Sequence, residues 1–226
     1  MPEEINRLLT DRLADVNLCC TGKNYSTMQS EGYGTSITSA IYHTGDLMLD
    51  AFNKLGSSSQ SVVNEKEYVA CTVHRAANIS NTNALHQIVD ALNIINKKIP
   101  VIVPLHPHTK KMMKTFGCNP SFTILEPLGY ADMKSFLTSA SYIITDSGGT
   151  CREAYFLHKK ALIVMDKPFW PEIVEDNCAV STGADTKLII DNFLALPTLP
   201  ANFTRNIFGD GNASVKIKKI LSTLHN

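Results

Sequence analysis

Three groups of residues in this sequence have side chains suited to binding or activating a phosphorylated ligand. The first is Asp146-Ser147-Gly148-Gly149, which follows the apolar run Tyr142–Thr145 and opens a helix-like segment ending near Leu157. A strand, a glycine turn and a helix in this order present backbone N–H groups and the positive end of the helix dipole to an anion. Ser147 adds a hydroxyl donor, and Glu153, about one helical turn further along, is spaced to reach a sugar hydroxyl. The pattern predicts a phosphate site, although the same residues also make an ordinary N-capped turn.

Histidine and arginine residues follow two other apolar runs. His74-Arg75 comes directly after Tyr68–Val73, and His106-Pro107-His108 comes after Pro100–Leu105. Histidine serves as an acid or base near neutral pH, and arginine can hold a diphosphate through two parallel hydrogen bonds. The alternative for His74-Arg75 is a pair that only anchors its loop. His106 and His108 also suggest a metal, but no acidic or cysteine cluster lies near them in sequence, so we expect no metal site.

A parallel sheet would bring these groups together. From residue 66 onward, short apolar runs alternate with segments of helical periodicity. The expected strands are Tyr68–Val73, Pro100–Leu105, Phe122–Leu125, Tyr142–Thr145, Ala161–Val164 and Ala179–Ser181. The expected helices are Thr82–Lys98, Thr109–Phe116, Tyr130–Ser139, Asp185–Leu194 and one after Gly209-Asp210-Gly211, with a turn at Trp170-Pro171-Glu172. This alternation predicts an α/β fold with a Rossmann-like parallel sheet covered on both faces. Ligands in such sheets bind at the carboxyl ends of the strands, where all three groups lie.

The first 55 residues contain too few strands to bury their own faces. A helix over residues 1–15 carries Glu3 in its first turn, where an acidic side chain complements the helix dipole. Strands at Val16–Cys20 and Ala40–His43 and helices at 24–31 and Leu47–Leu55 follow. We therefore expect residues 1–55 to be the remnant of a larger N-terminal Rossmann-like domain. Residues 56–65, which include the serine-rich Gly56–Gln60, are expected to be a linker, and 66–226 a second domain.

Composition narrows the functional class. Of the 226 residues, 44% are hydrophobic, and 21 Lys and Arg balance 21 Asp and Glu to a formal net charge of zero. Such a chain has no basic surplus for nucleic acid or an anionic membrane surface. No apolar run approaches the roughly 18 residues of a membrane span, and the start Met1-Pro2-Glu3-Glu4 is not a signal peptide. The six cysteines form no Cys-x-x-Cys pair, which indicates a reducing cytoplasm without disulfides or zinc.

The motifs in order resemble the non-hydrolysing UDP-N-acetylglucosamine 2-epimerases across nearly the whole chain. The segments that carry the resemblance are Pro2-Glu3-Glu4-Ile5-Asn6-Arg7, Thr44-Gly45-Asp46, Val73-His74-Arg75-Ala76, Pro104-Leu105-His106-Pro107, Pro127-Leu128-Gly129-Tyr130, Asp146-Ser147-Gly148-Gly149 with Glu153, Pro171-Glu172 and Gly209-Asp210-Gly211. The resemblance implies a two-domain fold of the glycosyltransferase-B type with its active site in the cleft between domains. It also implies that residues 66–226 are the C-terminal nucleotide-sugar-binding domain.

The activity implied by the resemblance is interconversion of UDP-N-acetylglucosamine and UDP-N-acetylmannosamine, in polysaccharide biosynthesis. The implied route removes the C2 proton and expels UDP, then adds UDP back after reprotonation on the opposite face. No metal, nicotinamide or other cofactor is implied, and the intact family is expected to be homodimeric. By the resemblance, His74 and Glu3 are catalytic, and the ligand is held by Arg75, His106, Ser147, Gly148, Gly149 and Glu153.

The sequence also departs from the family pattern. Ala77 stands where a glutamate is common, Arg152 replaces an acidic residue, and Trp170 replaces an arginine. The chain begins well inside the family's first domain, so about 100–150 residues are expected to be missing. Three hypotheses follow. One is a truncated epimerase that is inactive without a separately encoded N-terminal half; the others are a non-catalytic UDP-sugar-binding module and a glycosyltransferase-like domain.

Overall fold

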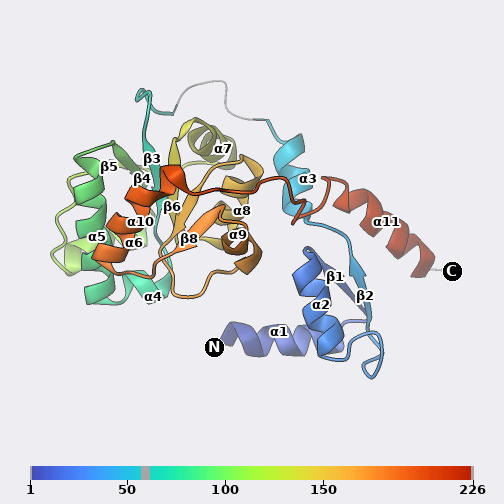
Figure 1. The fold of residues 1–226 in the computed structure, drawn as a ribbon. Coiled ribbons are helices and arrows are strands. Elements are labelled where there is room, and N and C mark those ends of the chain that lie inside the picture. The colour runs from blue at the N-terminus through green and yellow to red at the C-terminus, as the bar shows by residue number, and fades with distance from the viewer. Residues whose placement is uncertain (1, 57–61, 225–226) are drawn as a thin grey trace. The chain divides into compact units, whose positions relative to one another are not determined.

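The chain forms two compact units (Figure 1). The computed structural model describes residues 2–56 and 62–224. The first unit combines Met1–Leu55 with Arg205–Asn226, and the second spans Gly56–Thr204. Of the expected linker 56–65, residues 57–61 lie outside the described residues. The C-terminal segment was expected in the second domain, but it packs within the first unit, where its helix contacts the helix that precedes the linker.

A parallel sheet of six strands forms the centre of the second unit. Its strands are β3 (Val69–Thr72), β4 (Val101–Pro104), β5 (Thr123–Leu125), β6 (Tyr142–Thr145), β7 (Ala161–Ile163) and β8 (Ala179–Ser181). The spatial order is β5-β4-β3-β6-β7-β8, so the chain builds outward from β3 in one direction and then restarts beside it with β6. The β3–β6 junction is therefore the topological switch point, where doubly wound sheets bind ligands.

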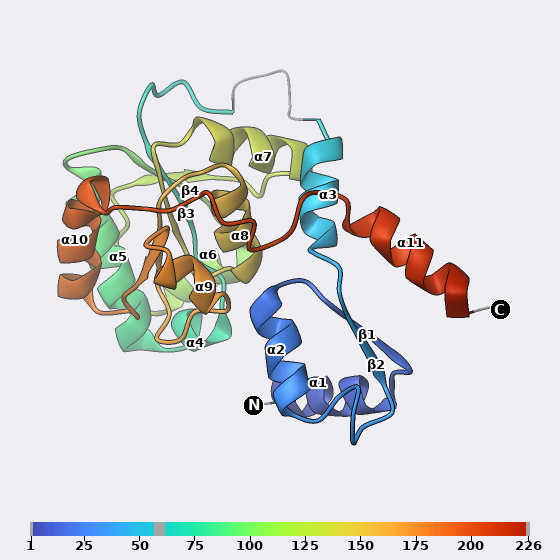
Figure 2. The ribbon, with the colours of Figure 1, turned by 45° about the vertical axis from the view of Figure 1, so that its right-hand side comes forward.

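Helices cover both faces of this sheet. They are α4 (Ala76–Ile79), α5 (Thr82–Asn96), α6 (Pro107–Thr115), α7 (Tyr130–Ser139), α8 (Gly148–Phe156), α9 (Pro171–Glu175) and α10 (Thr186–Ala195), with the 3₁₀ turn η1 (Leu196–Thr198). In both ribbon views α5 and α10 lie side by side on one face, and α7 and α8 lie on the other (Figures 1 and 2). Every residue of β3 and β4 is buried, as expected for strands covered on both sides.

Capping residues set several helix boundaries that periodicity alone misplaced. The helix expected from Thr109 begins at Pro107, because His106 caps it and proline suits its first turn. The helix expected from residue 24 begins at Gly22, because Thr21 caps it. The turn expected at Trp170-Pro171-Glu172 leads into the short helix α9. The one-turn helix α4, directly after His74-Arg75, was not predicted.

The first unit contains α1 (Pro2–Leu13), β1 (Val16–Cys19), α2 (Gly22–Ser30), β2 (Ala40–His43), α3 (Leu47–Lys54) and α11 (Ala213–Leu224). Strands β1 and β2 pair in parallel. The buried carboxylate of Asp50 in α3 accepts hydrogen bonds from Ala213 N, Ser214 N and Ser214 Oγ at 3.0, 2.8 and 2.6 Å. Because these N–H groups open α11 and lack partners within it, α3 caps and holds the C-terminal helix.

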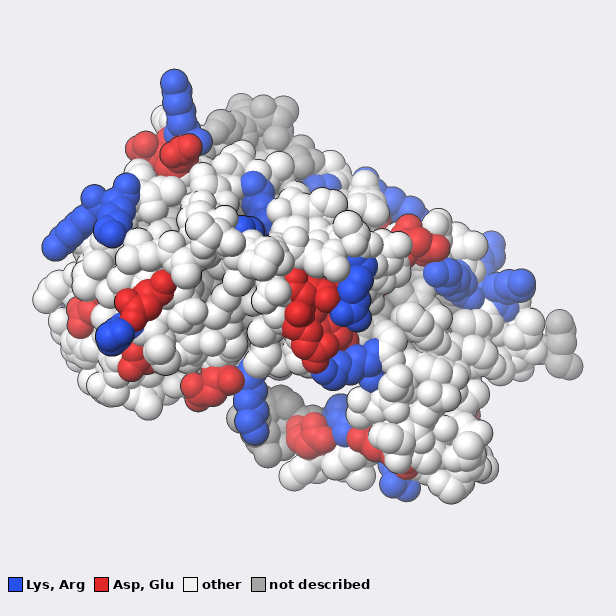
Figure 3. All heavy atoms as spheres, viewed as in Figure 1, with Lys and Arg blue, Asp and Glu red and all other residues white. Residues whose placement is uncertain are grey.

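Surface properties of the described residues agree with the composition. None of the described helices has the length and apolar content to cross a membrane. On the face in Figure 3, acidic and basic side chains are interspersed, so neither sign dominates that face.

Candidate active site

Asp146 joins the loops that follow β3 and β6. Its side chain is fully buried, and its carboxylate accepts hydrogen bonds from His74 N, Arg75 N and Asn78 Nδ2 at 2.9–3.1 Å. Asn78 Nδ2 also donates to Val164 O at 3.0 Å, which adds the segment after β7. A buried carboxylate is stable only when hydrogen bonds replace its hydration. Asp146 therefore fixes three strand ends relative to one another at the switch point.

His74 lies next to this buried carboxylate. Its Nδ1 is 3.5 Å from Asp146 Oδ1, and its side chain is about half exposed, at 51%. Because Nδ1 lies on the side of this carboxylate, Nε2 is the ring nitrogen left to exchange a proton with a ligand. An acid or base role needs such an oriented ring.

Arg75 is held from two sides. Its Nε donates to Asp146 O at 2.9 Å, and its guanidinium lies 4.0 Å from the centre of the Phe169 ring. Among residues 2–56 and 62–224, its two Nη groups have no hydrogen-bond partner. The side chain is therefore anchored through Nε and ring while its Nη donors remain available to an anion.

The glycine turn forms the N-terminus of α8. Ser147 is its N-cap, and Ser147 Oγ accepts from Thr150 N at 3.3 Å, so the N-cap alternative describes the local geometry. A cap and an anion site are compatible, because the first-turn N–H groups of Gly148 and Gly149 have no intrahelical acceptor. A Cβ on Gly148 would lie 3.0 Å from Phe169 Cδ2, whereas one on Gly149 would meet only Ser147 Oγ at 3.6 Å. The open space at this turn is therefore in front of Gly149.

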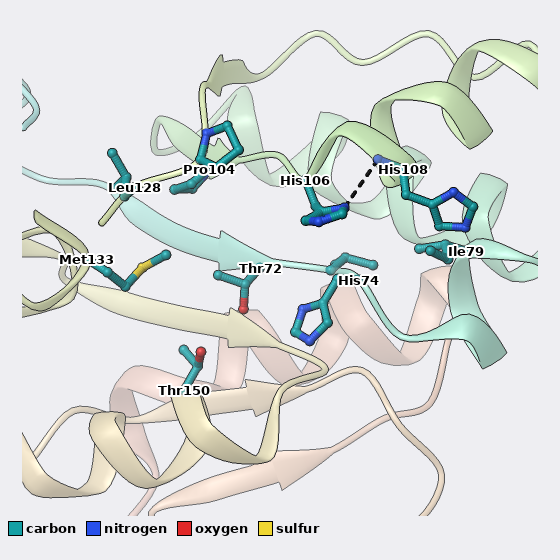
Figure 4. Close-up of a pocket in the computed structure, with 11 residues that line it drawn as sticks. Thr72, His74, Ile79, Pro104, His106, His108, Leu128, Met133 and Thr150 are labelled. Atoms are coloured by element: carbon teal, nitrogen blue, oxygen red, sulfur yellow. Dashed lines mark hydrogen bonds between the residues drawn. The ribbon is translucent and has the colours of Figure 1, made fainter. Parts of the chain in front are cut away.

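A pocket of about 400 Å³ adjoins these loops (Figure 4). Its walls come from Thr72, Val73, His74, Ile79, Pro104, His106, His108, Pro127, Leu128, Met133 and Thr150. His106 Nδ1 accepts from the backbone N of His108 at 3.2 Å, so the neutral ring carries its proton on Nε2. The volume and mixed lining suit a small organic ligand.

Glu153 lies in α8 and is buried, with 8% of its surface exposed. Burial raises its pKa, while Arg152 opposes that effect. Its carboxylate has no hydrogen-bond partner among residues 2–56 and 62–224. Burial together with the Glu153 charge also raises the pKa of Tyr130 at the start of α7. The neighbouring Cys151 is also buried, which raises its pKa to about 12 and leaves it a protonated packing residue.

The structure thus gathers most of the predicted site residues in one unit. His74, Arg75, His106, Ser147, Gly148, Gly149 and Glu153 all follow or flank β3, β4 and β6. Glu3 lies in α1 of the other unit, so its role stays a prediction. Sequence reasoning missed Asp146 as the residue that orders the site, and missed Asn78 altogether. The signal that could have identified Asp146 is its position: an aspartate at the end of an apolar strand and directly before a glycine turn.

Two of the three departures from the family pattern contact each other. The Arg152 guanidinium lies 4.9 Å from the centre of the Trp170 ring, and Trp170 Nε1 donates to Gly148 O at 2.9 Å. Ala77 is exposed in α4. Within the described residues, no group of three or more His, Cys, Asp or Glu side chains is placed to hold a metal ion.

The family model described as UDP-N-acetylglucosamine 2-epimerase matches residues 1–222. The chain belongs to this family. A UDP-N-acetylglucosamine 2-epimerase homolog from Methanococcus maripaludis is 33% identical over 99% of the chain and 65% of its own length. The UDP-2,3-diacetamido-2,3-dideoxy-D-glucuronate 2-epimerase of Pseudomonas aeruginosa is 31% identical over 99% of the chain and 64% of its own length. The chain therefore spans just under two thirds of the curated relatives it matches.

Solved structures of the family have the same fold. The crystal structure of Methanocaldococcus jannaschii UDP-GlcNAc 2-epimerase, in complex with UDP-GlcNAc and UDP, aligns with a TM-score of 0.82 at 28% identity. It covers 99% of this chain and 65% of the solved chain. The predicted fold class, α/β with a Rossmann-like parallel sheet of the glycosyltransferase-B type, is thereby confirmed.

Proposed function

We propose that this chain is the nucleotide-binding part of a UDP-N-acetylglucosamine 2-epimerase, an isomerase that converts UDP-N-acetylglucosamine to UDP-N-acetylmannosamine. The observation that carries the proposal is the convergence of the α8 N-terminus, His74 and Arg75 on the β3–β6 switch point, with Asp146 fixing all three. A helix N-terminus beside an arginine suits a diphosphate, and an oriented histidine suits proton transfer at the attached sugar.

In the proposed route, a base removes the sugar C2 proton and the C1–O bond to UDP breaks, which leaves a 2-acetamidoglucal. Reprotonation at C2 on the opposite face and return of UDP to C1 complete the inversion. Arg75 and the N–H groups of Gly148 and Gly149 would stabilise the charge on the departing diphosphate. His74 Nε2 would exchange a proton with the reacting sugar, and Ser147 and Glu153 would bind phosphate and ribose. His106 Nε2 would donate to the ligand, and Glu3 would supply a carboxylate to the chemistry.

The identity of the sugar is a separate question, because the names of two relatives of similar identity refer to different UDP-sugars. We place UDP-N-acetylglucosamine first, since the matching family model carries that description. UDP-2,3-diacetamido-2,3-dideoxy-glucuronate is the second candidate, from the Pseudomonas aeruginosa relative. Beside Gly148, the contact between Arg152 and Trp170 places a cation and an aromatic ring where the family pattern has an acidic residue and an arginine. Both sugars should therefore be offered to the protein.

Turnover is proposed to need a further polypeptide segment, because the chain spans only 64–65% of its relatives. A separately encoded N-terminal half is one source of that segment, and a homodimer is the proposed assembly.

Six free thiols and the nucleotide-sugar substrate support a cytoplasmic location. A UDP-sugar-binding module without catalysis is the alternative and would retain every contact described above.

The test is titration calorimetry of UDP on the parent chain and on Gly149→Val. A branched side chain would fill the open space before Gly149, so UDP affinity should fall by more than about tenfold, or ~1.4 kcal/mol. Gly22→Val is the matched control. Gly22 also opens a capped helix with no atom within 4 Å of an added Cβ, but it lies in the first unit. Equal affinities for parent and Gly149→Val, or no UDP binding by the parent, would refute the site.

A further inference from the structure

The segment after β7 places an aromatic residue on the glycine turn. Phe169 Cδ2, Cγ and Cβ lie 3.0, 3.1 and 3.4 Å from the position of a Cβ built on Gly148. The ring therefore occupies the side of the turn that any side chain at Gly148 would take. Trp170 Nε1 donates to Gly148 O at 2.9 Å, so two consecutive residues of this segment contact the same glycine.

The same ring contacts Arg75. The guanidinium carbon lies 4.0 Å from the ring centre, a distance at which a cation is attracted to the aromatic face. Phe169 is 46% exposed, so the ring is not held there as part of the hydrophobic core. An exposed aromatic ring that contacts both an arginine and a helix N-terminus has a local role at that site.

Resting on the proposed function, we propose that Phe169 is a positioning residue for diphosphate binding. With only Nε donating to Asp146 O, the planar guanidinium as a whole can still pivot about that hydrogen bond. The Phe169 face restricts that freedom and holds the Nη donors beside the α8 N-terminus. One anion can then contact the arginine and the helix N–H groups together. Binding also costs less conformational entropy, because the long arginine side chain is already partly ordered before the anion arrives.

The proposal assigns Phe169 to the diphosphate and not to the nucleoside. It acts through Arg75 and touches no reacting atom. A change at Phe169 should therefore alter affinity for UDP, leave affinity for uridine unchanged, and have no effect once the arginine is removed.

The experiment measures UDP and uridine affinities of the parent chain, Phe169→Leu, Phe169→Tyr, Arg75→Gln and the Arg75→Gln/Phe169→Leu double variant. Leucine keeps bulk but has no aromatic face, so UDP affinity should fall about two- to fivefold, the size of an exposed cation–π contact. Tyrosine keeps the face and should restore parent affinity. Phe169→Leu should add nothing in the Arg75→Gln background.

A second measurement does not need ligand. The ring current of Phe169 shifts the Arg75 Nε–H resonance, so that resonance should move in Phe169→Leu and stay close to its parent position in Phe169→Tyr. Unchanged UDP affinity and resonance in Phe169→Leu, equal loss for uridine, or an undiminished effect in the Arg75→Gln background would each overturn the proposal. Failure of the parent to bind UDP would refute the proposed function and this inference together, whereas a UDP-binding parent with an inert Phe169 refutes only the inference.

Discussion

Gly148 and Gly149 are adjacent, but they are glycines for different physical reasons. At Gly148 the space for a side chain is filled by the Phe169 ring, whereas at Gly149 it is open. The sequence pattern predicted phosphate access for both, since a missing Cβ admits either a ring or a ligand. A substitution at Gly148 would displace Phe169 first, so only Gly149 tests the phosphate site without disturbing its neighbours.

The carboxylate of Glu153 should lower the stability of the fold and increase the affinity for UDP. Burial raises the pKa of Glu153, because it disfavours the ionised form in the folded state. Ionisation therefore lowers the free energy of unfolding once the pH exceeds the ordinary carboxyl range. Glu153→Gln removes that cost and should raise the melting temperature at pH 7, with the difference vanishing as the pH falls below the unfolded pKa. A neutral amide is a weaker acceptor for a ribose hydroxyl, so affinity for UDP should fall about tenfold.

Thermal melts against pH, with calorimetry of UDP, check both halves of this expectation. Glu126→Gln is the matched control, because Glu126 is a largely exposed carboxylate, with a side-chain exposure of 83%. It should change neither the pH profile nor the affinity. A Glu153→Gln variant with the parent melting temperature across the pH range would contradict the burial argument.

Among the secondary-structure elements, strand pairing brings the site together. Thr72 of β3 pairs with Thr145 of β6 in the sheet, and their hydroxyls hydrogen-bond at 2.7 Å. The loops that leave these two residues therefore start side by side, and Asp146 needs to reach only the next few N–H groups. In the first unit, Asp50 plays a similar capping role between α3 and α11.

Acid should release α11 from α3. Burial pushes the pKa of Asp50 upward, but hydrogen bonds from Ser214 and Ala213, with Lys54, lower it overall. A lowered carboxyl pKa contributes stability that is present above the unfolded pKa and is lost as the pH falls through the folded pKa. Asp50→Asn should mimic that loss at neutral pH and cost about 1–3 kcal/mol, because an amide has only one acceptor oxygen and leaves a buried donor of α11 unsatisfied.

Hydrogen exchange of the α11 amides measures this release directly. Asp50→Asn should exchange faster along α11 at neutral pH, and the parent should approach the variant only in acid. Asp191→Asn offers a control, since Asp191 forms an exposed ion pair with Lys187 within α10 and such pairs contribute little. Equal α11 protection in parent and Asp50→Asn would show that the cap does not hold this helix.

At the scale of the whole molecule, the first unit exposes an apolar surface. Ile5, Leu8, Leu9 and Leu13 of α1 have 40–82% of their surfaces exposed. One small core cluster in this unit consists of Cys19, Met28 and Tyr33 with partly buried neighbours. Exposed apolar stripes of this kind mark surfaces that bind other protein. The relatives are about half as long again, so a polypeptide segment exists in them that could cover such a surface.

Turnover should require that further segment. On the proposal that the chain supplies only part of the site, it should bind UDP weakly alone and exchange no C2 hydrogen, because turnover requires the sugar to be positioned and water to be excluded. Adding a polypeptide with the amino-terminal third of a relative should restore deuterium incorporation at C2 in heavy water. His74→Ala should abolish the restored exchange, and His86→Gln, which alters a histidine bonded to Phe116 O in another part of the unit, should not. Rapid exchange by the chain alone would contradict the requirement.

Periodicity and motif order determined a large part of this structure. Buried runs such as Tyr142–Thr145 predicted parallel strands, because a strand covered on both faces is apolar along most of its length. The position of His74, His106 and Gly149 at strand ends followed from the same pattern, since every strand of a parallel sheet ends at one edge.

Tertiary structure alone decided how the loops after the strands are joined. Nothing in the local sequence links Asp146 to the backbone of His74 and Arg75, more than 70 residues away, because that pairing exists only once β6 lies beside β3. The placement of Phe169 on Gly148 depends on the same packing. The packing of α11 against α3 could likewise not be predicted from the sequence, because periodicity indicates the apolar face of a helix but not the element that covers it.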